Sequence, residues 1–201
     1  MEADFAVELG ADDETLEIPW SAHGGHPRYY DLKHQPEMLC ALEEIQRVPE
    51  LAGFLRAVNS AAGGLESAKC DVWWSAELNP EEEIFGASQK FGGYVDLLFS
   101  NESARVSFHE CESFAKRVVE LLKAVPEIPA AAELLIRRCF RHETDETREG
   151  FYITCYVFGY GEDESQARQR WAIGLELVAN AIRQVEAGGN RYSPFTLSQL
   201  R

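Results

Sequence analysis

The residues best suited to chemistry are aromatic and acidic side chains in three predicted strands. Side chains two positions apart in a strand point to the same face of the sheet, so the three strands can gather these groups on the face that helices leave open. Ring faces attract cations and carboxylates neutralise them, which suits a small cationic or amphipathic ligand. The expected ligand-binding residues are Trp73, Tyr94, Tyr152, Tyr156, Asp71 and Asp96.

Two other interpretations of this face stay open. The helices expected within residues 36–59 could cover it, or a second subunit could. The alternative function is therefore a protein-interaction module that forms a homodimer or binds a basic partner, as toxin-neutralising immunity proteins do. An enzyme with an unrecognised site is the third hypothesis. The sequence favours a protein without catalytic activity, because no pair of nucleophile and base is visible.

Other groups of reactive residues have spacings that argue against a site. The loop 23–26 carries two histidines near His34 and Cys40, but it has no second ligand pair with the spacing of a zinc site. His109 and Cys111 are two positions apart in a predicted helix, so they point to different sides. The sequence contains no glycine-rich phosphate loop and no EF-hand spacing. We therefore predict no catalytic residue, no metal site and no cofactor.

The predicted elements place the aromatic and acidic side chains in paired strands beneath helices. Alternating apolar residues predict strands over 69–78, 91–100, 133–141 and 151–160. The capping-box pattern that starts at Ser107 begins a helix that ends before Pro126, and a second helix with one apolar face covers 162–187. The expected fold class is α+β, with an antiparallel sheet of at least four strands and two long helices on one face.

The order of the elements indicates a weak internal duplication. Residues 66–125 and 133–187 each read strand, strand, helix. Short strands at 16–18 and 105–106 would instead give two strand-helix-strand-strand units and a final helix. That order is similar to the duplicated domain of the GyrI-like family, bacterial proteins that bind cationic or amphipathic small molecules. The resemblance implies a ligand of this class and transfers no binding residue.

The domain boundaries follow from the same reading. We expect residues 1–189 to form a single α+β domain, in which 1–62 supply an N-terminal strand, a loop and short helices. Residues 190–201 are expected to be a flexible tail.

Composition limits the partners and the compartment. The chain has 34 acidic and 19 basic residues and a formal charge of −15, which repels nucleic acid and anionic membranes, so we expect neither as a partner. No apolar run approaches the roughly 18 residues of a membrane helix, and the start lacks a signal-peptide pattern. The five cysteines form no CxxC pair and are expected to be reduced. A cytoplasmic location is the expectation.

Overall fold

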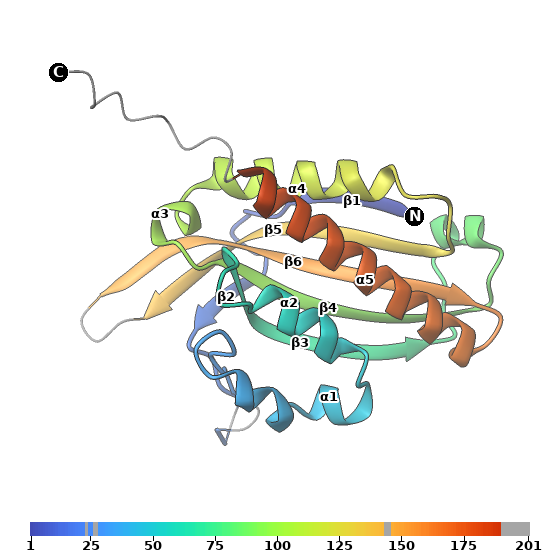
Figure 1. Cartoon of the computed structure of the whole chain (residues 1–201), viewed down its shortest axis with the longest axis horizontal. Coiled ribbons are helices and arrows are strands. Elements are labelled where there is room, and N and C mark those ends of the chain that lie inside the picture. Colours follow the sequence, from blue (N-terminus) through green and yellow to red (C-terminus); the bar gives the residue numbers. More distant parts are fainter. Residues whose placement is uncertain (23, 26–27, 143–145, 190–201) are drawn as a thin grey trace.

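The computed structural model describes residues 1–22, 24–25, 28–142 and 146–189. Within them the chain forms one mostly antiparallel sheet of six strands together with several helices (Figure 1), which confirms the α+β class. The strand order is β1-β5-β6-β4-β3, and β2 also pairs with β5. The strands are β1 (Glu2–Val7), β2 (Thr15–Ile18), β3 (Leu65–Ser75), β4 (Gln89–Phe99), β5 (Ala130–His142) and β6 (Thr147–Gly161).

The four strands predicted from alternation are present and pair as antiparallel neighbours, but two further strands run parallel to β5. Strand β1 pairs with Ala131–Ile136, and β2 pairs with Arg138–Arg141 farther along β5. The sequence predicts an antiparallel sheet, but the observed sheet is mixed because β1 and β2 pair with β5 in parallel. The alternation rule misses β1 because only Ala3 is buried within that strand.

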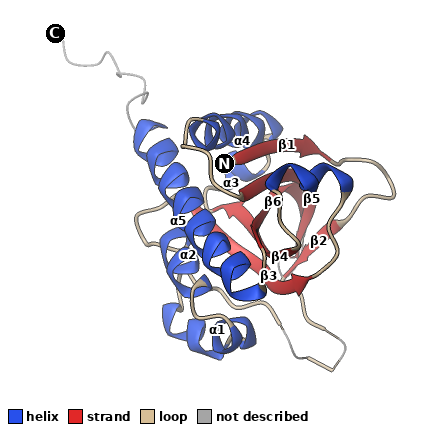
Figure 2. Cartoon of the chain, turned by 90° about the vertical axis from the view of Figure 1, so that its right-hand side faces the viewer, coloured by secondary structure: helices blue, strands red, loops and turns tan. Residues whose placement is uncertain are grey.

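Three helices form a layer on one face of the sheet. Helices α4 and α5 pack on the strands and on each other, and α2 packs beside α5 (Figure 2). Ser107 caps α4 as predicted, because its hydroxyl accepts a hydrogen bond of 3.3 Å from the Glu110 backbone N–H. The helices are η1 (Pro36–Ala41), α1 (Glu43–Arg47), α2 (Leu51–Val58), η2 (Pro80–Phe85), α3 (Glu102–Arg105), α4 (Phe108–Lys123) and α5 (Glu164–Gly189).

The placement of α2 answers one question that the sequence left open. Phe54, Leu55 and Val58 of α2 are buried in the same apolar core as Trp171 of α5. Helix α2 therefore extends the layer formed by α4 and α5 and does not cover the opposite face. The aromatic face faces away from these three helices.

One local prediction is wrong. The pair 105–106, expected as a strand in the strand-helix-strand-strand division, forms the end of α3 and the turn after it. Asn101 starts this helix instead, since its side-chain oxygen accepts a hydrogen bond of 3.2 Å from the Ala104 N–H. The duplication of strand-strand-helix units stays a prediction, and the expected tail 190–201 lies outside the described residues.

None of the described helices is both long enough and apolar enough to cross a membrane.

The contact between β6 and α5 gives a test of the fold. A Cβ atom added at Gly159 would lie 2.1 Å from the Trp171 backbone nitrogen and 2.3 Å from the Ala167 carbonyl oxygen. We expect Gly159→Ala to lower the free energy of unfolding by about 3 kcal/mol or more, because helix and strand must separate. Urea unfolding followed by circular dichroism measures this loss.

A matched glycine provides the control. A Cβ atom added at Gly53 of α2 would have no neighbour within 4 Å. We expect Gly53→Ala to raise stability by about 0.5–1 kcal/mol through the better helix propensity of alanine. Equal effects of the two substitutions would contradict the packing of α5 on β6.

Candidate functional site

The face of the sheet opposite the helix layer is divided into a covered part and an open part. Apolar side chains of β2 cover the first part, and Trp20 and Tyr29 pack against them. The Trp20 indole Nε1–H donates a hydrogen bond of 2.8 Å to the Ala68 carbonyl of β3, so the chain after β2 crosses this face from β5 to β3. The buried residues of this second core are Leu16, Ile18, Ala68, Leu98, Cys139 and Tyr152.

Tyr152 therefore belongs to a core and not to an open site. Its side chain is 1% exposed, and burial raises its pKa. The alternation rule placed it correctly on the face away from the helices, but the N-terminal segment covers that end of the face.

The open part of the face brings together three predicted site residues. Tyr94 and Tyr156 are opposite one another in the pairing of β4 with β6, with ring centroids 5.6 Å apart. The Trp73 ring lies 6.4 Å from each of them, and Phe158 stacks on Tyr156. All four rings are partly exposed. The predicted aromatic cluster is thus present, with Phe158 as a member that the sequence analysis did not include.

Asp96 lies in a network of hydrogen-bonded polar side chains that crosses the sheet. Its side chain is 3% exposed, and its Oδ1 accepts a hydrogen bond of 2.7 Å from the Thr154 hydroxyl. Arg137 Nη1 donates to the same hydroxyl over 3.3 Å, and Arg137 Nε donates to Glu8 Oε2 over 2.6 Å. Burial raises the pKa of Asp96 to about 7, although the Thr154 hydrogen bond and the positive charge of Lys69 act in the opposite direction.

Sequence reasoning missed Arg137 and Glu8. The signal was available, because Arg137 follows the apolar run Leu134, Leu135 and Ile136 within a predicted strand. A buried guanidinium needs a partner, so such a position indicates a polar chain across the sheet.

Asp71 lies at the surface. Its Oδ1 accepts a hydrogen bond of 2.7 Å from the Val72 N–H and forms an ion pair of 3.3 Å with Arg47. Asp71 and Tyr94 both line a groove beside β3, so two of the six predicted residues contact the same cavity.

The groove has a volume of about 560 Å³ and lies between the crossing segment, the start of α1 and strand β3. Its aromatic walls are Trp20, Tyr30 and Tyr94. Carboxylates outnumber cationic side chains along it, five to two within the described residues. The carboxylates are Glu14, Glu17, Glu43, Glu44 and Asp71, and the cations are Arg28 and Lys69.

Three of these carboxylates have ion-pair or hydrogen-bond partners outside the groove lining. Glu14 pairs with Arg137 over 3.2 Å, Glu17 pairs with His142, and Asp71 pairs with Arg47. Glu43 and Glu44 lie in the first turn of α1. Burial raises the pKa of the Cys70 thiol beside them, and the charge of Glu44 adds to this effect, so the thiol stays protonated and is a poor nucleophile.

Lys69 occupies the space between two groove walls. Its Nζ lies 6.0 Å from the centroid of the Trp20 ring and 6.0 Å from that of Tyr94. The position arises from an irregularity in the sheet, because the pairing of β3 with β4 shifts register between Ser67 and Cys70. Strict alternation over 69–78 already places Lys69 on the face of Asp71 and Trp73, but sequence reasoning missed it because only aromatic and acidic side chains were considered there.

The structure describes two of the four residues considered for a zinc site, His34 and Cys40. His23 and His26 of the zinc hypothesis lie outside the described residues. His34 Nδ1 lies 2.9 Å from the Asp31 carboxylate, and Cys40 Sγ donates to the Glu37 carbonyl. Over the described ranges no group of three or more potential metal ligands occurs.

Comparison with known proteins finds no similarity to report: no family model, no curated protein and no solved structure matches the chain.

The buried Asp96 predicts an unusual pH dependence of stability. With a pKa of about 7 in the folded protein, against an ordinary value of 3.8, Asp96 holds its proton more tightly in the folded than in the unfolded state. Its contribution to the free energy of unfolding is therefore fully present below about pH 4 and is lost as pH rises to about 7. We expect Asp96→Asn to remove this loss, on the order of 2–4 kcal/mol.

Urea unfolding of both proteins at pH 5 and pH 8 measures the difference. The matched control is Asp71→Asn, which removes an exposed carboxylate from the neighbouring strand. An Asp96→Asn protein that loses more stability at pH 8 than at pH 5 would mean that the carboxylate is stabilising as an anion, against our expectation.

Proposed function

We propose that this protein binds a small cationic or amphipathic molecule in the groove beside β3. The observation that carries the proposal is the position of the Lys69 ammonium between the Trp20 and Tyr94 rings. The ligand cation takes this position, and the flexible Lys69 side chain moves toward solvent. The chain's own ammonium group indicates the chemistry that these walls favour.

Size and charge support the same ligand class. A volume of about 560 Å³ lies within the range of roughly 300–1,000 Å³ that is common for small-molecule sites. A flat aromatic cation gains contact area on both rings that an ammonium on an alkyl chain does not provide. The carboxylates of Glu43 and Glu44, which form no ion pair among the described residues, further favour a positive charge.

A second cation position nearby fits this preference. Lys90 Nζ lies 5.7 Å from the centroid of Phe158 and forms an ion pair of 2.8 Å with Glu82. Phe158 is in contact with Trp73 and Tyr156, so a lysine ammonium lies beside each side of the aromatic cluster. Rings and carboxylates together attract cations across this part of the face.

Three probes of similar size and different charge test the ligand class. We expect benzyltrimethylammonium to bind, benzyl alcohol to bind more weakly and phenylacetate to bind least, as measured by isothermal titration calorimetry. The order follows from the ring walls and the carboxylates of the groove. Equal affinities for the three probes would contradict a site that selects positive charge.

Variants of the groove should change this affinity in opposite directions. We expect Tyr94→Leu to weaken benzyltrimethylammonium binding by about tenfold, because it removes one ring from the cation. Glu44→Gln should also weaken it, whereas Lys69→Gln should strengthen it by removing the competing ammonium. Glu81→Gln is the control, since Glu81 is exposed and does not line the groove. If Glu44→Gln and Glu81→Gln weaken benzyltrimethylammonium binding equally, the overall charge of the protein, and not the groove, determines the affinity.

A protein interface is the second candidate, because the clustered rings of Trp73, Tyr94 and Tyr156 are partly exposed. Large exposed aromatic side chains are common in interfaces. If the aromatic cluster is a free ligand site, the wild-type protein and Tyr156→Glu should both be monomers by size-exclusion chromatography with light scattering. A wild-type dimer that Tyr156→Glu dissociates would instead assign the cluster to a subunit interface.

A further inference from the structure

A row of side chains crosses the open face of the sheet from β1 to β4. Asp4 of β1 is the register partner of Glu133 of β5, and Glu133 is that of Tyr156 of β6. Tyr156 is in turn opposite Tyr94 of β4. Register partners in neighbouring strands place their side chains on the same face, and Phe5, the residue after Asp4, packs on the helix side against the apolar core. The row therefore has an acidic end, Asp4 and Glu133, and an aromatic end.

The acidic end of the row consists of two like charges without a neutralising partner. Both side chains are exposed, and neither Asp4 nor Glu133 forms an ion pair with a described residue. Desolvation and then the charges of Glu8 and Asp4 raise the pKa of Glu133, whereas Arg137 acts in the opposite direction. Arg137 is itself paired with Glu8 and Glu14. Like charges in neighbouring strands repel, so a cation bound beside them would stabilise this end of the row.

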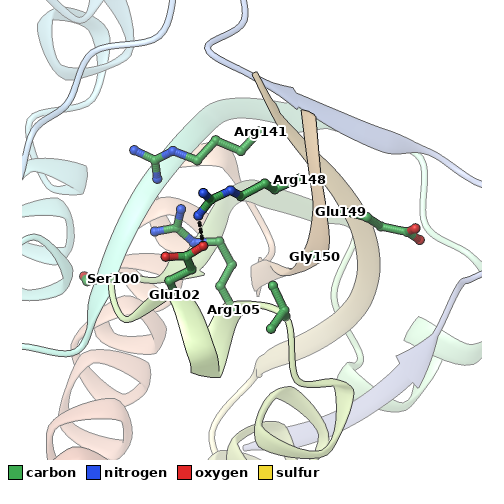
Figure 3. Close-up of a pocket in the computed structure, with 8 residues that line it drawn as sticks. Ser100, Glu102, Arg105, Arg141, Arg148, Glu149 and Gly150 are labelled. Atoms are coloured by element: carbon green, nitrogen blue, oxygen red, sulfur yellow. Dashed lines mark hydrogen bonds and ion pairs between the residues drawn. The ribbon is translucent and has the colours of Figure 1, made fainter. Parts of the chain in front are cut away.

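Elsewhere on the chain a cluster of charges is neutralised from within. A pocket where β5 and β6 meet α3 is lined by arginines, and Figure 3 shows the Arg148 guanidinium directed at the Glu102 carboxylate. Arg105 of the same pocket pairs with Glu66 over 3.1 Å. The arginines of that pocket thus have carboxylate partners, whereas the acidic end of the row has no cationic partner among the described residues.

The aromatic end of the row is partly exposed and includes rings without a cation of their own. The rings of Tyr156 and Phe158 are parallel to within 2°, with centroids 6.1 Å apart, and Trp73 meets both edge-on. Lysines lie beside Tyr94 and Phe158, but within the described ranges no lysine or arginine lies over the ring of Trp73 or Tyr156. A planar cation from outside the chain can therefore pack on these rings next to Glu133.

We propose that this row and the aromatic cluster bind an arginine-containing segment of a partner protein. A guanidinium group is planar and stacks on aromatic rings, and it also donates paired hydrogen bonds to a carboxylate. It thereby matches both ends of the row. The compact ammonium group of lysine offers neither the planar surface nor the paired donors.

Charge separates such a partner from a second copy of the chain. With a formal charge of −15 the chain attracts a basic segment, whereas two copies repel one another. A second copy would also bring its own Asp4 and Glu133 to the contact. The proposal does not depend on the ligand of the groove, because Glu133 and Tyr156 do not line it.

Two synthetic peptides of equal charge test the chemistry of the partner. One alternates arginine with serine, the other alternates lysine with serine, and both carry a fluorescent label for anisotropy titrations. We expect the arginine peptide to bind the wild-type protein about tenfold more tightly, because its guanidinium groups stack on the rings. Tyr156→Leu should reduce this preference, since it removes the ring next to Glu133.

A matched pair of charge variants tests the acidic end of the row. We expect Glu133→Gln to weaken binding of the arginine peptide by about three- to tenfold, because one carboxylate is lost. Glu120→Gln is the control, since it removes the same charge from an exposed position of α4 in the helix layer on the other face. It should leave the affinity nearly unchanged. Circular dichroism checks that both variants are folded.

Three results would overturn the proposal. The first is equal affinity of the wild-type protein for the two peptides, or binding of neither. The second is equal weakening in Glu133→Gln and Glu120→Gln, which would mean a general charge effect. The third is a wild-type dimer in light scattering that Tyr156→Glu dissociates, which would assign this surface to a second copy. Each of these results leaves benzyltrimethylammonium binding in the groove to be judged by its own titration.

Discussion

The burial of Arg137 in the middle of β5 is the constraint on which the rest of this architecture depends. A guanidinium that is 8% exposed must be paired, since an unpaired buried charge costs several kcal/mol. The structure pairs it with Thr154 inside the sheet and with Glu8 and Glu14 from the two ends of the β1-β2 connection. These contacts fix the connection over the face that the helices leave open. They also set the path along which β2 joins the far part of β5.

The candidate site follows from that path. With β2 in place, the next residues cross the sheet, and the hydrogen bond from Trp20 to Ala68 ties them to β3. Glu14 and Trp20 thereby become groove walls, and the bulge in β3 brings Lys69 between Trp20 and Tyr94. The ion pairs of a buried arginine, a crossing segment and a bulge together create a cavity from residues that are distant in sequence. The same covering segment converts the other half of the face into a second apolar core around Tyr152.

The sequence predicted the helices and strands that have a local sequence signal. It did not predict burial or strand pairing that depends on contacts between distant residues. Alternation and capping predict β3 to β6, α4 and α5, and the period of two places Trp73, Tyr94 and Tyr156 on one face. Alternation assigns a side chain to a face but does not reveal what covers that face, so Tyr152 and Asp96 were expected at the surface and are buried. Strand β1 carries too little apolar pattern to be recognised, and its parallel pairing with β5 depends on residues about 130 positions away.

The most direct test uses the four tryptophans as reporters, because each lies in a different environment. Trp20 lines the groove, Trp73 belongs to the aromatic cluster, Trp74 is exposed on β3, and Trp171 is the buried tryptophan of α5. We would titrate ¹⁵N-labelled protein with benzyltrimethylammonium and follow the indole N–H signals. We expect the Trp20 signal to move most and the Trp171 signal to stay unchanged. Shifts confined to Trp73 and Trp74, with Trp20 unaffected, would contradict a binding site in the groove.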